Sequence, residues 1–309
     1  MAIKPSFFVI GAQKAGTTTL HDWLATSPEV LLPSIKETHF FSEAERYSLG
    51  IGWYEKQFGR NVSDSKSIVG EIDPDYLFFP ASAARIQQVV GSPKLIVMLR
   101  EPVSRARSQY LMSCRRGYEN LSFIDALCAE RDRCAEGTRF NLENHSYIAR
   151  GLYAEQIIRW KQMFPFSEML FIKFDDLFNR EKHDEKMRKL CTFLGINPNL
   201  VRCDISKKSN QASEPRFTLL RDMLYGKSKI KRAIGSCIPS RDLKLRIALW
   251  LDKVNLKPAS ITEQEGGTDA LPTFVHKLFL TDLKKCAALT DLNVDDWIAI
   301  HEKALGMHR

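Results

Sequence analysis

The sequence of 309 residues lacks any apolar run of about 18 residues or more, so no membrane-spanning helix is expected. We also expect no signal peptide, because the chain passes within a few residues of Met1 into a short strand-like run. It has no internal repeat or low-complexity tract, which argues against solenoid and disordered proteins. Its hydrophobic content of 44% and charged content of 27% are those of an ordinary globular domain.

The seven cysteines are scattered, and they form neither a Cys-x-x-Cys pair nor a metal-like spacing with histidine. They are Cys114, Cys128, Cys134, Cys191, Cys203, Cys237 and Cys286. Reduced, buried thiols are the simplest interpretation, and such thiols persist in a reducing compartment. We therefore expect a cytoplasmic protein without a bound metal.

The formal net charge of +8 arises from one segment, in which thirteen Lys and Arg residues stand against four Asp and Glu residues between Lys207 and Lys257. Such a segment suits phosphates, an acidic substrate or peripheral contact with an anionic membrane. A solvated helical face is the equally open alternative. Specific nucleic-acid binding is disfavoured, because aromatic residues are not interleaved and no known motif is present.

Short apolar runs alternate with helical patterns up to about residue 200. The runs typical of buried strands are Phe7–Ile10, Ser67–Glu71, Lys94–Leu99 and Met169–Lys173. Helices are expected over about residues 17–25, 102–114 and 181–194, with Gly195 as the C-terminal cap of the last. This alternation predicts an α/β fold with a P-loop-like central parallel sheet flanked by helices.

After Ser206 the strand patterns stop, and a helical C-terminal part is expected. The predicted helices are Phe217–Met223, Asp242–Val254, Pro272–Leu289 and Asp295–Leu305. We predict a single domain over residues 1–309, in which this part (about 206–309) packs on the α/β core (about 5–200). Two segments, Cys134–Ser146 and Ala259–Ala270, are expected to be loops that carry variable function.

A glycine-containing turn, GAQKAGTTT, joins the first expected strand to the first helix. Such a turn offers backbone N–H groups and a helix dipole to a phosphate. Its spacing nearly fits the ATP/GTP-binding loop, but Thr17 stands where that loop has lysine, and the only lysine is Lys14. The strand at 94–99 ends in Arg100 instead of a magnesium-binding aspartate. A P-loop nucleotide or small-molecule kinase is therefore the less favoured alternative.

Three segments together carry a family resemblance: GAQKAGTTTL, KETHFF (Lys36–Phe41) and LREPVSRARSQY (Leu99–Tyr110). They resemble the signature of sulfotransferases that use 3′-phosphoadenosine 5′-phosphosulfate (PAPS), closest to the heparan-sulfate-type branch and its bacterial relatives. The similarity spans about residues 7–200. It implies transfer of a sulfuryl group from PAPS to a hydroxyl, with 3′-phosphoadenosine 5′-phosphate (PAP) as product and no metal. A carbohydrate acceptor is our first expectation, with lipid and small-molecule alcohols left open.

The resemblance also implies residue roles in donor binding. Lys14 would stabilise charge on the bridging oxygen between sulfur and the 5′-phosphate. The backbone and hydroxyls of the turn would hold the phosphosulfate, through Ala15, Gly16, Thr17, Thr18 and Thr19. Simple helix capping is the alternative role of the threonines. Arg100 and Ser108 match 3′-phosphate binders, and Arg216 matches a looser third contact on the 3′-phosphate or adenine side.

The catalytic base is expected in the KETHFF segment. Glu37 matches the carboxylate that takes the proton of the acceptor hydroxyl. His39 is the rival, because an imidazole has a suitable pKa. Phe40 and Phe41 are expected to be core residues. The presence of both Lys14 and Glu37 disfavours a non-enzymatic binding module.

The segment GEIDPDYLF (Gly70–Phe78) is similar to a further motif of the same branch, but Ile72 replaces its lysine. The chain therefore lacks one cation that an acidic, heparan-like acceptor would favour. Asp73 and Asp75 are candidates for binding neutral sugar hydroxyls. A capped turn around Pro74 is the alternative.

Overall fold

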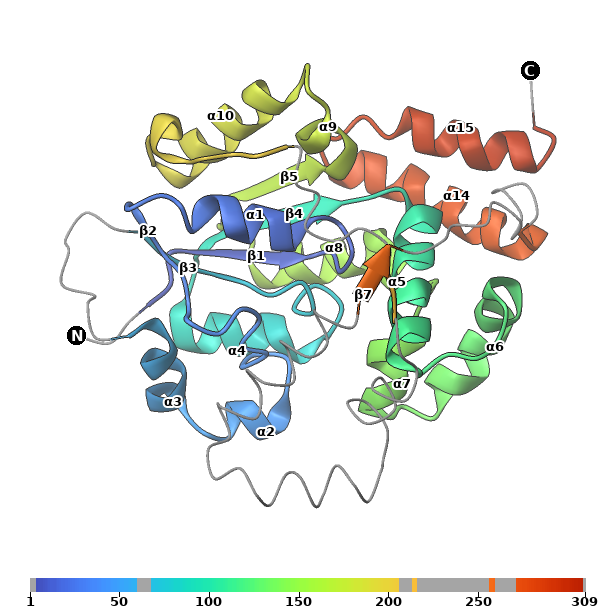
Figure 1. Ribbon diagram of the computed structural model, residues 1–309, viewed down its shortest axis with the longest axis horizontal. Coiled ribbons are helices and arrows are strands. Elements are labelled where there is room, and N and C mark those ends of the chain that lie inside the picture. The colour runs from blue at the N-terminus through green and yellow to red at the C-terminus, as the bar shows by residue number, and fades with distance from the viewer. Residues whose placement is uncertain (1–3, 60–67, 206–212, 216–255, 259–270, 308–309) are drawn as a thin grey trace. The chain divides into compact units, whose positions relative to one another are not determined.

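The structure is a computed structural model that describes residues 4–59, 68–205, 213–215, 256–258 and 271–307 (Figure 1). It divides into two compact units. The first contains residues 1–105, 150–209 and 273–309, and the second contains residues 106–149 and 210–272. The helices expected at 217–223 and 242–254, the loop expected at 259–270 and Arg216 lie outside the described residues.

A parallel sheet of five strands forms the centre of the first unit, in the order β2-β3-β1-β4-β5. Its strands are β1 (Phe7–Gly11), β2 (Val30–Leu31), β3 (Ile68–Ile72), β4 (Lys94–Leu99) and β5 (Met169–Lys173). Every residue of β1 is buried, and so are all but the first residues of β4 and β5. The predicted parallel sheet is confirmed, whereas β2 is too short to give a sequence pattern.

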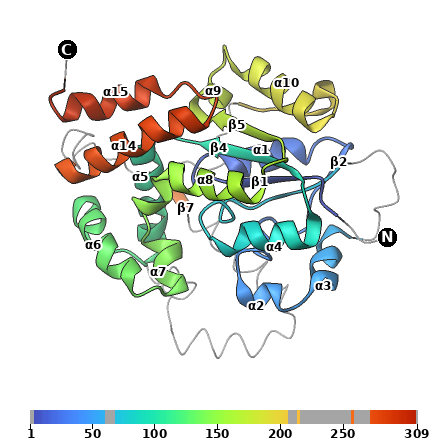
Figure 2. The same ribbon diagram turned by 180° about the vertical axis from the view of Figure 1, so that it is seen from behind.

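Helices cover both faces of this sheet. Figure 1 shows α1 (Thr17–Leu24) in front of the strands, and Figure 2 shows α8 (Tyr153–Met163) on the opposite face. The remaining helices and 3-10 turns before residue 205 are α2 (Ala44–Tyr47), α3 (Ile51–Glu55), η1 (Lys56–Phe58), α4 (Ala81–Val90), η2 (Ala149–Gly151), α9 (Phe174–Phe178), α10 (His183–Leu194) and η3 (Pro198–Leu200). As expected, α10 ends at Gly195, whose φ of 77° lies in the left-handed region that favours glycine.

Two predicted C-terminal helices are confirmed as α14 (Thr273–Leu289) and α15 (Asp295–Ala304), which lie side by side in both views (Figures 1 and 2). The carboxylate of Asp282 on α14 accepts hydrogen bonds from the backbone N–H groups of Tyr153, at 2.7 Å, and Ala154, at 3.1 Å. These N–H groups belong to the first turn of α8, which has no intrahelical acceptor for them. Asp282 thereby attaches the C-terminal helices to the core of the first unit.

The second unit is helical over its N-terminal part, with most of α5 (Pro102–Arg116), α6 (Phe123–Ala135) and α7 (Arg139–Asn144). The expectation of a loop over Cys134–Ser146 was wrong. A helix forms there because the hydroxyl of Thr138 accepts a hydrogen bond from the N–H of Asn141 at 3.3 Å and caps α7.

The expectation that strands stop after Ser206 was also wrong. Two strands of three residues, β6 (Ser213–Pro215) and β7 (Leu256–Pro258), pair antiparallel. Segments of this length contain too few residues to show an alternating pattern, and their pairing joins positions far apart in the chain. None of the helices in the described part of the chain is long and apolar enough to cross a membrane.

Candidate active site at the carboxyl edge of the sheet

The predicted site residues of the first unit follow neighbouring strands at one edge of the sheet. The loop with Lys14 follows β1, Asp73 follows β3, and Arg100 follows β4. Because β1 lies between β3 and β4 and all three run parallel, their carboxyl ends lie together. Crevices outside the carboxyl ends of parallel strands are the usual ligand sites of open α/β sheets.

The loop after β1 turns sharply into α1. Gly16 has a φ of 85° and is the N-cap of α1, and a Cβ there would lie only 2.7 Å from the Phe178 ring and 2.9 Å from the Phe174 ring. Glycine is therefore required both by the backbone and by packing. The N-cap position of α1 is occupied by Gly16, and the threonines at 17–19 lie inside the first turn of the helix, so none of them is the N-cap residue.

The first turn of α1 directs backbone N–H groups out of the helix N-terminus, where a helix has no internal acceptor for them. Thr17 and Thr19 are buried and Thr18 is half-buried. The N–H of Ala15 differs, because it donates to the carbonyl of Ala12 at 3.1 Å within the loop. The N-terminal end of α1 thus has the features of an anion-binding turn.

Arg100 joins this loop from β4. Its Nη1 donates to the carbonyl oxygen of Lys14 at 3.2 Å, and its guanidinium stacks on the Phe174 ring at 4.7 Å from the centroid. The side chain is half-buried, so part of the guanidinium stays accessible. Stacking fixes the plane of the guanidinium, and a guanidinium of fixed plane suits bidentate binding of a phosphate.

Three non-glycine residues in the described part of the chain have a positive φ: Lys14 at 71°, Glu37 at 60° and His39 at 52°. They are the three residues that the sequence predicted to be catalytic. Left-handed backbone is uncommon for such residues, and it costs about 1–3 kcal/mol when the surroundings impose it. Such strained positions cluster at active sites.

The side chain of His39 lies beside a carboxylate at the end of β3. Oδ2 of Asp73 accepts a hydrogen bond from the backbone N–H of His39 at 2.8 Å and lies 3.0 Å from Nδ1 of its ring. Oδ2 of Asp75 lies 3.6 Å from the same Nδ1. Burial by itself would lower the pKa of His39, but Asp73, Asp75 and Glu37 raise it to about 10.

Asp75 is held in turn by an arginine distant in the sequence. Nη1 of Arg150 lies 2.6 Å from Oδ1 of Asp75, and Arg150 is only 2% exposed. Nε2 of Gln13, in the loop after β1, lies 3.5 Å from the same oxygen. The backbone N–H of Asp75 donates to Oδ1 of Asp73 at 3.1 Å. These contacts connect the loop after β1, the end of β3 and the KETHFF segment.

These contacts favour the capped turn around Pro74 over sugar binding by Asp73 and Asp75. Both aspartates are buried, and their oxygens are engaged by His39 and Arg150. Ile72 is 1% exposed and belongs to the hydrophobic core. No sequence signal paired Arg150 with Asp75, because 75 positions separate them.

Beneath His39, Glu71 is fully buried among hydroxyl groups. Its carboxylate accepts hydrogen bonds from Thr38 Oγ1 at 2.5 Å, Tyr54 Oη at 2.7 Å and Tyr76 Oη at 3.0 Å. Burial and the charge of Asp73 nevertheless raise the pKa of Glu71 to about 7. Phe40 and Phe41 pack beside these tyrosines in the core, as predicted.

Glu37 is half-buried, with 29% of its side chain exposed, and forms an ion pair with Lys36. Its carboxylate is therefore accessible, whereas the carboxylate of Glu71 is fully buried in the core. His21 on α1 faces the same pair, since Lys36 and Glu37 both influence its pKa. The dominant influence there is burial, which lowers the pKa of His21.

His39, Asp73 and Asp75 bring three ligand-type atoms within 4.8 Å of one another. The described contacts already balance the charge of this group, because Arg150 pairs with Asp75 and the His39 ring pairs with Asp73. A divalent cation would have to displace both side-chain cations, so we assign no metal to it.

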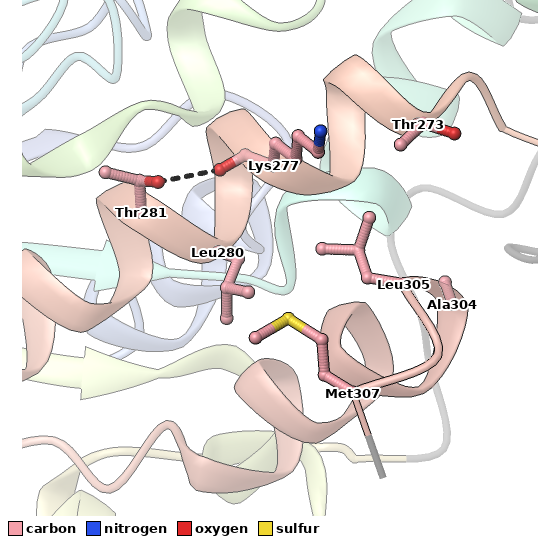
Figure 3. Close-up of a pocket in the computed structure, with 7 residues that line it drawn as sticks. All are labelled: Thr273, Lys277, Leu280, Thr281, Ala304, Leu305 and Met307. Atoms are coloured by element: carbon pink, nitrogen blue, oxygen red, sulfur yellow. Dashed lines mark hydrogen bonds between the residues drawn. The ribbon is translucent and has the colours of Figure 1, made fainter.

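Ser108, the second predicted 3′-phosphate binder, is half-buried on α5 in the second unit. Arg216, the third, lies outside the described residues. A separate pocket of about 600 Å³ lies on α14 and α15 and contains none of the predicted site residues (Figure 3). Its lining residues are Thr273, Lys277, Leu280, Thr281, Ala304, Leu305 and Met307.

The fold defines the chain as a P-loop-like α/β protein, and the loop after β1 has the features of an anion-binding turn. The Sulfotransferase domain family matches residues 4–231. The chain therefore belongs to the sulfotransferase domain family, which confirms the family predicted from the three segments.

Two curated relatives show how far the similarity extends. The membrane-associated sulfotransferase kil1 of Dictyostelium discoideum is 25% identical over 269 residues, covering 62% of this chain and 56% of the relative. Heparan sulfate glucosamine 3-O-sulfotransferase 3B1 of Mus musculus is 30% identical over 192 residues, covering 62% and 46%. The chain thus spans about half the length of the curated relatives it matches.

Among solved structures, the sulfotransferase from Alicyclobacillus acidocaldarius resembles the whole chain. The TM-score is 0.63 at 24% identity, and the match covers 96% of this chain and 99% of that one. This similarity shows a shared fold and confirms the predicted fold class.

Proposed function

We propose that the protein transfers a sulfuryl group from PAPS to an acceptor hydroxyl. The observation that carries the proposal is the position of Arg100 beside the loop that contains Lys14, because its guanidinium donates to the backbone carbonyl of Lys14 just before the N-terminus of α1. A magnesium-dependent kinase needs an aspartate after a buried strand to hold its metal. Arg100 stands at that place after β4, where it suits a second phosphate of the donor.

The residues present fit PAPS as donor substrate. The N–H groups at the start of α1 suit the 5′-phosphosulfate, and Arg100 suits the 3′-phosphate, with Ser108 and Arg216 as its further proposed ligands. The ammonium group of Lys14 stabilises the charge that develops on the bridging oxygen as its bond to sulfur breaks.

The acceptor must lose a proton as its oxygen forms the new bond to sulfur. Glu37 is the proposed base, because its carboxylate is accessible and its backbone is fixed with a positive φ. His39 is a poor base, because a ring with a pKa near 10 already carries its proton at neutral pH. The proton therefore passes to Glu37, and the electron pair of the broken bond stays with PAP.

The proposed acceptor is a carbohydrate hydroxyl, which the names of the heparan sulfate relatives support. A buried Ile72 stands where the heparan-type branch has a lysine, and the absence of that cation favours a less acidic acceptor than heparan sulfate. A panel of neutral and sulfated glycans with ³⁵S-labelled PAPS tests this point, and labelling of lipid alcohols alone would contradict it. The cytoplasmic location stays a prediction from the cysteine pattern, and the six cysteines within the described residues are all free.

A thermal-shift titration tests the donor. At about 100 times its dissociation constant, PAP should stabilise the fold by about 2.7 kcal/mol, whereas ATP with magnesium should do little. Arg100→Ala should remove most of the PAP shift. Arg139→Ala, which breaks a surface pair with Glu143, is the matched control and should keep the shift. A shift with Mg-ATP and none with PAP would overturn the proposal and favour a kinase.

A further inference from the structure

We propose that Asp73 is a positioning residue that holds the ring of His39 as a cation beside Glu37. The inference deepens the proposed function and rests on it for the role of that cation in the reaction. Its geometric basis is independent of any ligand, because it lies in contacts between the ends of β3 and the KETHFF segment.

Asp73 contacts both the backbone and the ring of His39 through a single oxygen, by a hydrogen bond to the backbone and an ion-pair contact with the ring. Oδ2 accepts the backbone N–H of His39 at 2.8 Å and approaches ring Nδ1 at 3.0 Å. The side chain of Asp73 is 0% exposed, so water cannot replace the histidine as its partner. A carboxylate buried in this way requires a cationic or strongly donating neighbour.

The arrangement of charges around the ring makes that neighbour the imidazolium form. Asp73 and Asp75 face Nδ1 from the β3 side, and Glu37 acts on the ring from its own segment. Arg150 neutralises Asp75 from the far side. With a cationic His39, the two aspartates are balanced by two cations, His39 and Arg150. A neutral ring would leave the negative charge of Asp73 without a balancing cation.

Among the described residues, the other charged groups near the ring do not place a second cation at Asp73. Glu71 lies on the other side of Thr38 and is held by the hydroxyls of Tyr54 and Tyr76. Lys36 pairs with Glu37 and not with Asp73. Within the described residues, His39 is therefore the ring that balances Asp73.

A cationic His39 donates hydrogen bonds and accepts none. Nδ1 is turned toward Asp73, which leaves Nε2 as the donor not held by that carboxylate, and 23% of the side chain is exposed. In the proposed reaction, this ring offers positive charge to an oxygen of the reactants and leaves proton removal to Glu37. Asp73 acts only through His39.

Nuclear magnetic resonance of ring-labelled histidine tests the proposal without donor or acceptor. The resonance of His39 is assigned as the one missing in His39→Gln, among seven histidines. We expect the wild-type ring to stay charged up to pH 9. Asp73→Asn should lower its titration midpoint by about 1–3 pH units, since an opposite charge within contact distance shifts a pKa by that amount.

The control is Asp22→Asn, which removes a carboxylate 3.3 Å from the His21 ring and should leave the His39 midpoint unchanged. A wild-type midpoint below pH 7.5, or an unchanged midpoint in Asp73→Asn, would overturn the proposal. If Asp73→Asn does not fold, the wild-type titration and Asp75→Asn replace it. Asp75→Asn should lower the His39 midpoint by less than the shift expected for Asp73→Asn, and an unchanged midpoint would overturn the proposal.

The alkaline limb of the pH profile of kcat/KM supplies the functional readout. A positioning role predicts that Asp73→Asn shifts this limb to lower pH, by the same number of pH units as it shifts the ring midpoint. A merely structural role would lower thermal stability and leave the limb in place. The ring titration stands whether or not sulfuryl transfer is observed, so failure of the proposed function and failure of this inference are distinguishable.

Discussion

The first unit contains two clusters that combine histidine with carboxylate side chains, and the two differ in charge and exposure. At the β3 end, His39 faces two carboxylates and its pKa is raised to about 10. At the start of α5, Nε2 of His301 lies 3.7 Å from Oε1 of Glu101, and its Nδ1 is 3.0 Å from Nδ1 of His276. One of those two Nδ1 atoms must accept, so the second cluster disfavours a doubly charged pair.

Exposure separates the two clusters further. His276 and His301 are 1% and 0% exposed, and they join α14 to α15 and to Glu101. Burial alone would raise the pKa of Glu101, but His301 and the N–H groups of Val103 and Ser104 hold it below its ordinary value. His39 instead has strained backbone and an accessible ring. The comparison shows that the second cluster attaches the C-terminal helices, whereas the strain and exposure of the first cluster agree with the chemistry proposed for it.

The largest expected effect is on activity at the first cluster. Glu37→Gln should lower the rate of ³⁵S transfer by about 10²- to 10⁴-fold, the usual contribution of a general base. Thermal stability should change little, because Glu37 is half-buried and pairs only locally with Lys36. Glu45→Gln, at an exposed position of α2, is the control. A loss smaller than tenfold would remove Glu37 as the base.

The charge of His39 should appear in the pH dependence of stability. Its folded pKa near 10 exceeds the ordinary 6.5, so the stabilisation is complete below pH 6.5 and is lost as the pH rises through 10. This difference corresponds to about 3–5 kcal/mol as an upper figure. Urea unfolding at pH 6, 8 and 10 measures it. Asp73→Asn should flatten the profile, and an equally steep profile in that variant would contradict the assignment.

The second cluster should respond in stability and not in chemistry. His301→Leu removes the bond to His276 and the contact with Glu101, at a cost of about 1–3 kcal/mol in the free energy of unfolding. Urea unfolding measures the loss, and PAP binding at a temperature where the variant is folded should be close to that of wild type. A lost PAP shift without loss of stability would break the comparison.

The smallest effect is expected at the bond between α14 and α8. Asp282→Ala removes the acceptor of two N–H groups and should cost about 0.5–2 kcal/mol, as the loss of a helix cap does. Asp282→Asn keeps a cap oxygen and should cost less at pH 7. Burial raises the pKa of Asp282 from 3.8 to about 6, so ionisation of the wild-type group lowers the stability of the fold as the pH rises through 6. Equal losses in both variants would contradict the capping role.

Much of the architecture was predictable from local pattern. β4 and β5 match their predicted ranges, and β1 extends one residue further, because strands covered on both faces read as continuous apolar runs. The helices α4, α6 and α8 were not predicted. α7 depends on one cap residue, Thr138, inside a polar segment.

The sequence alone determined the family and the parallel sheet, and it predicted the anion-binding loop and the site residues Lys14, Glu37, His39 and Arg100, because these are carried by contiguous motifs with fixed spacing. Only the tertiary structure decided how those residues are held. The pairing of Arg150 with Asp75, the contact of His39 with Asp73 that raises its pKa, and the hydrogen bond of Thr38 to Glu71 join segments that are 75, 34 and 33 positions apart. A spacing rule cannot carry such information, because charge and burial belong to the folded surroundings and not to the segment.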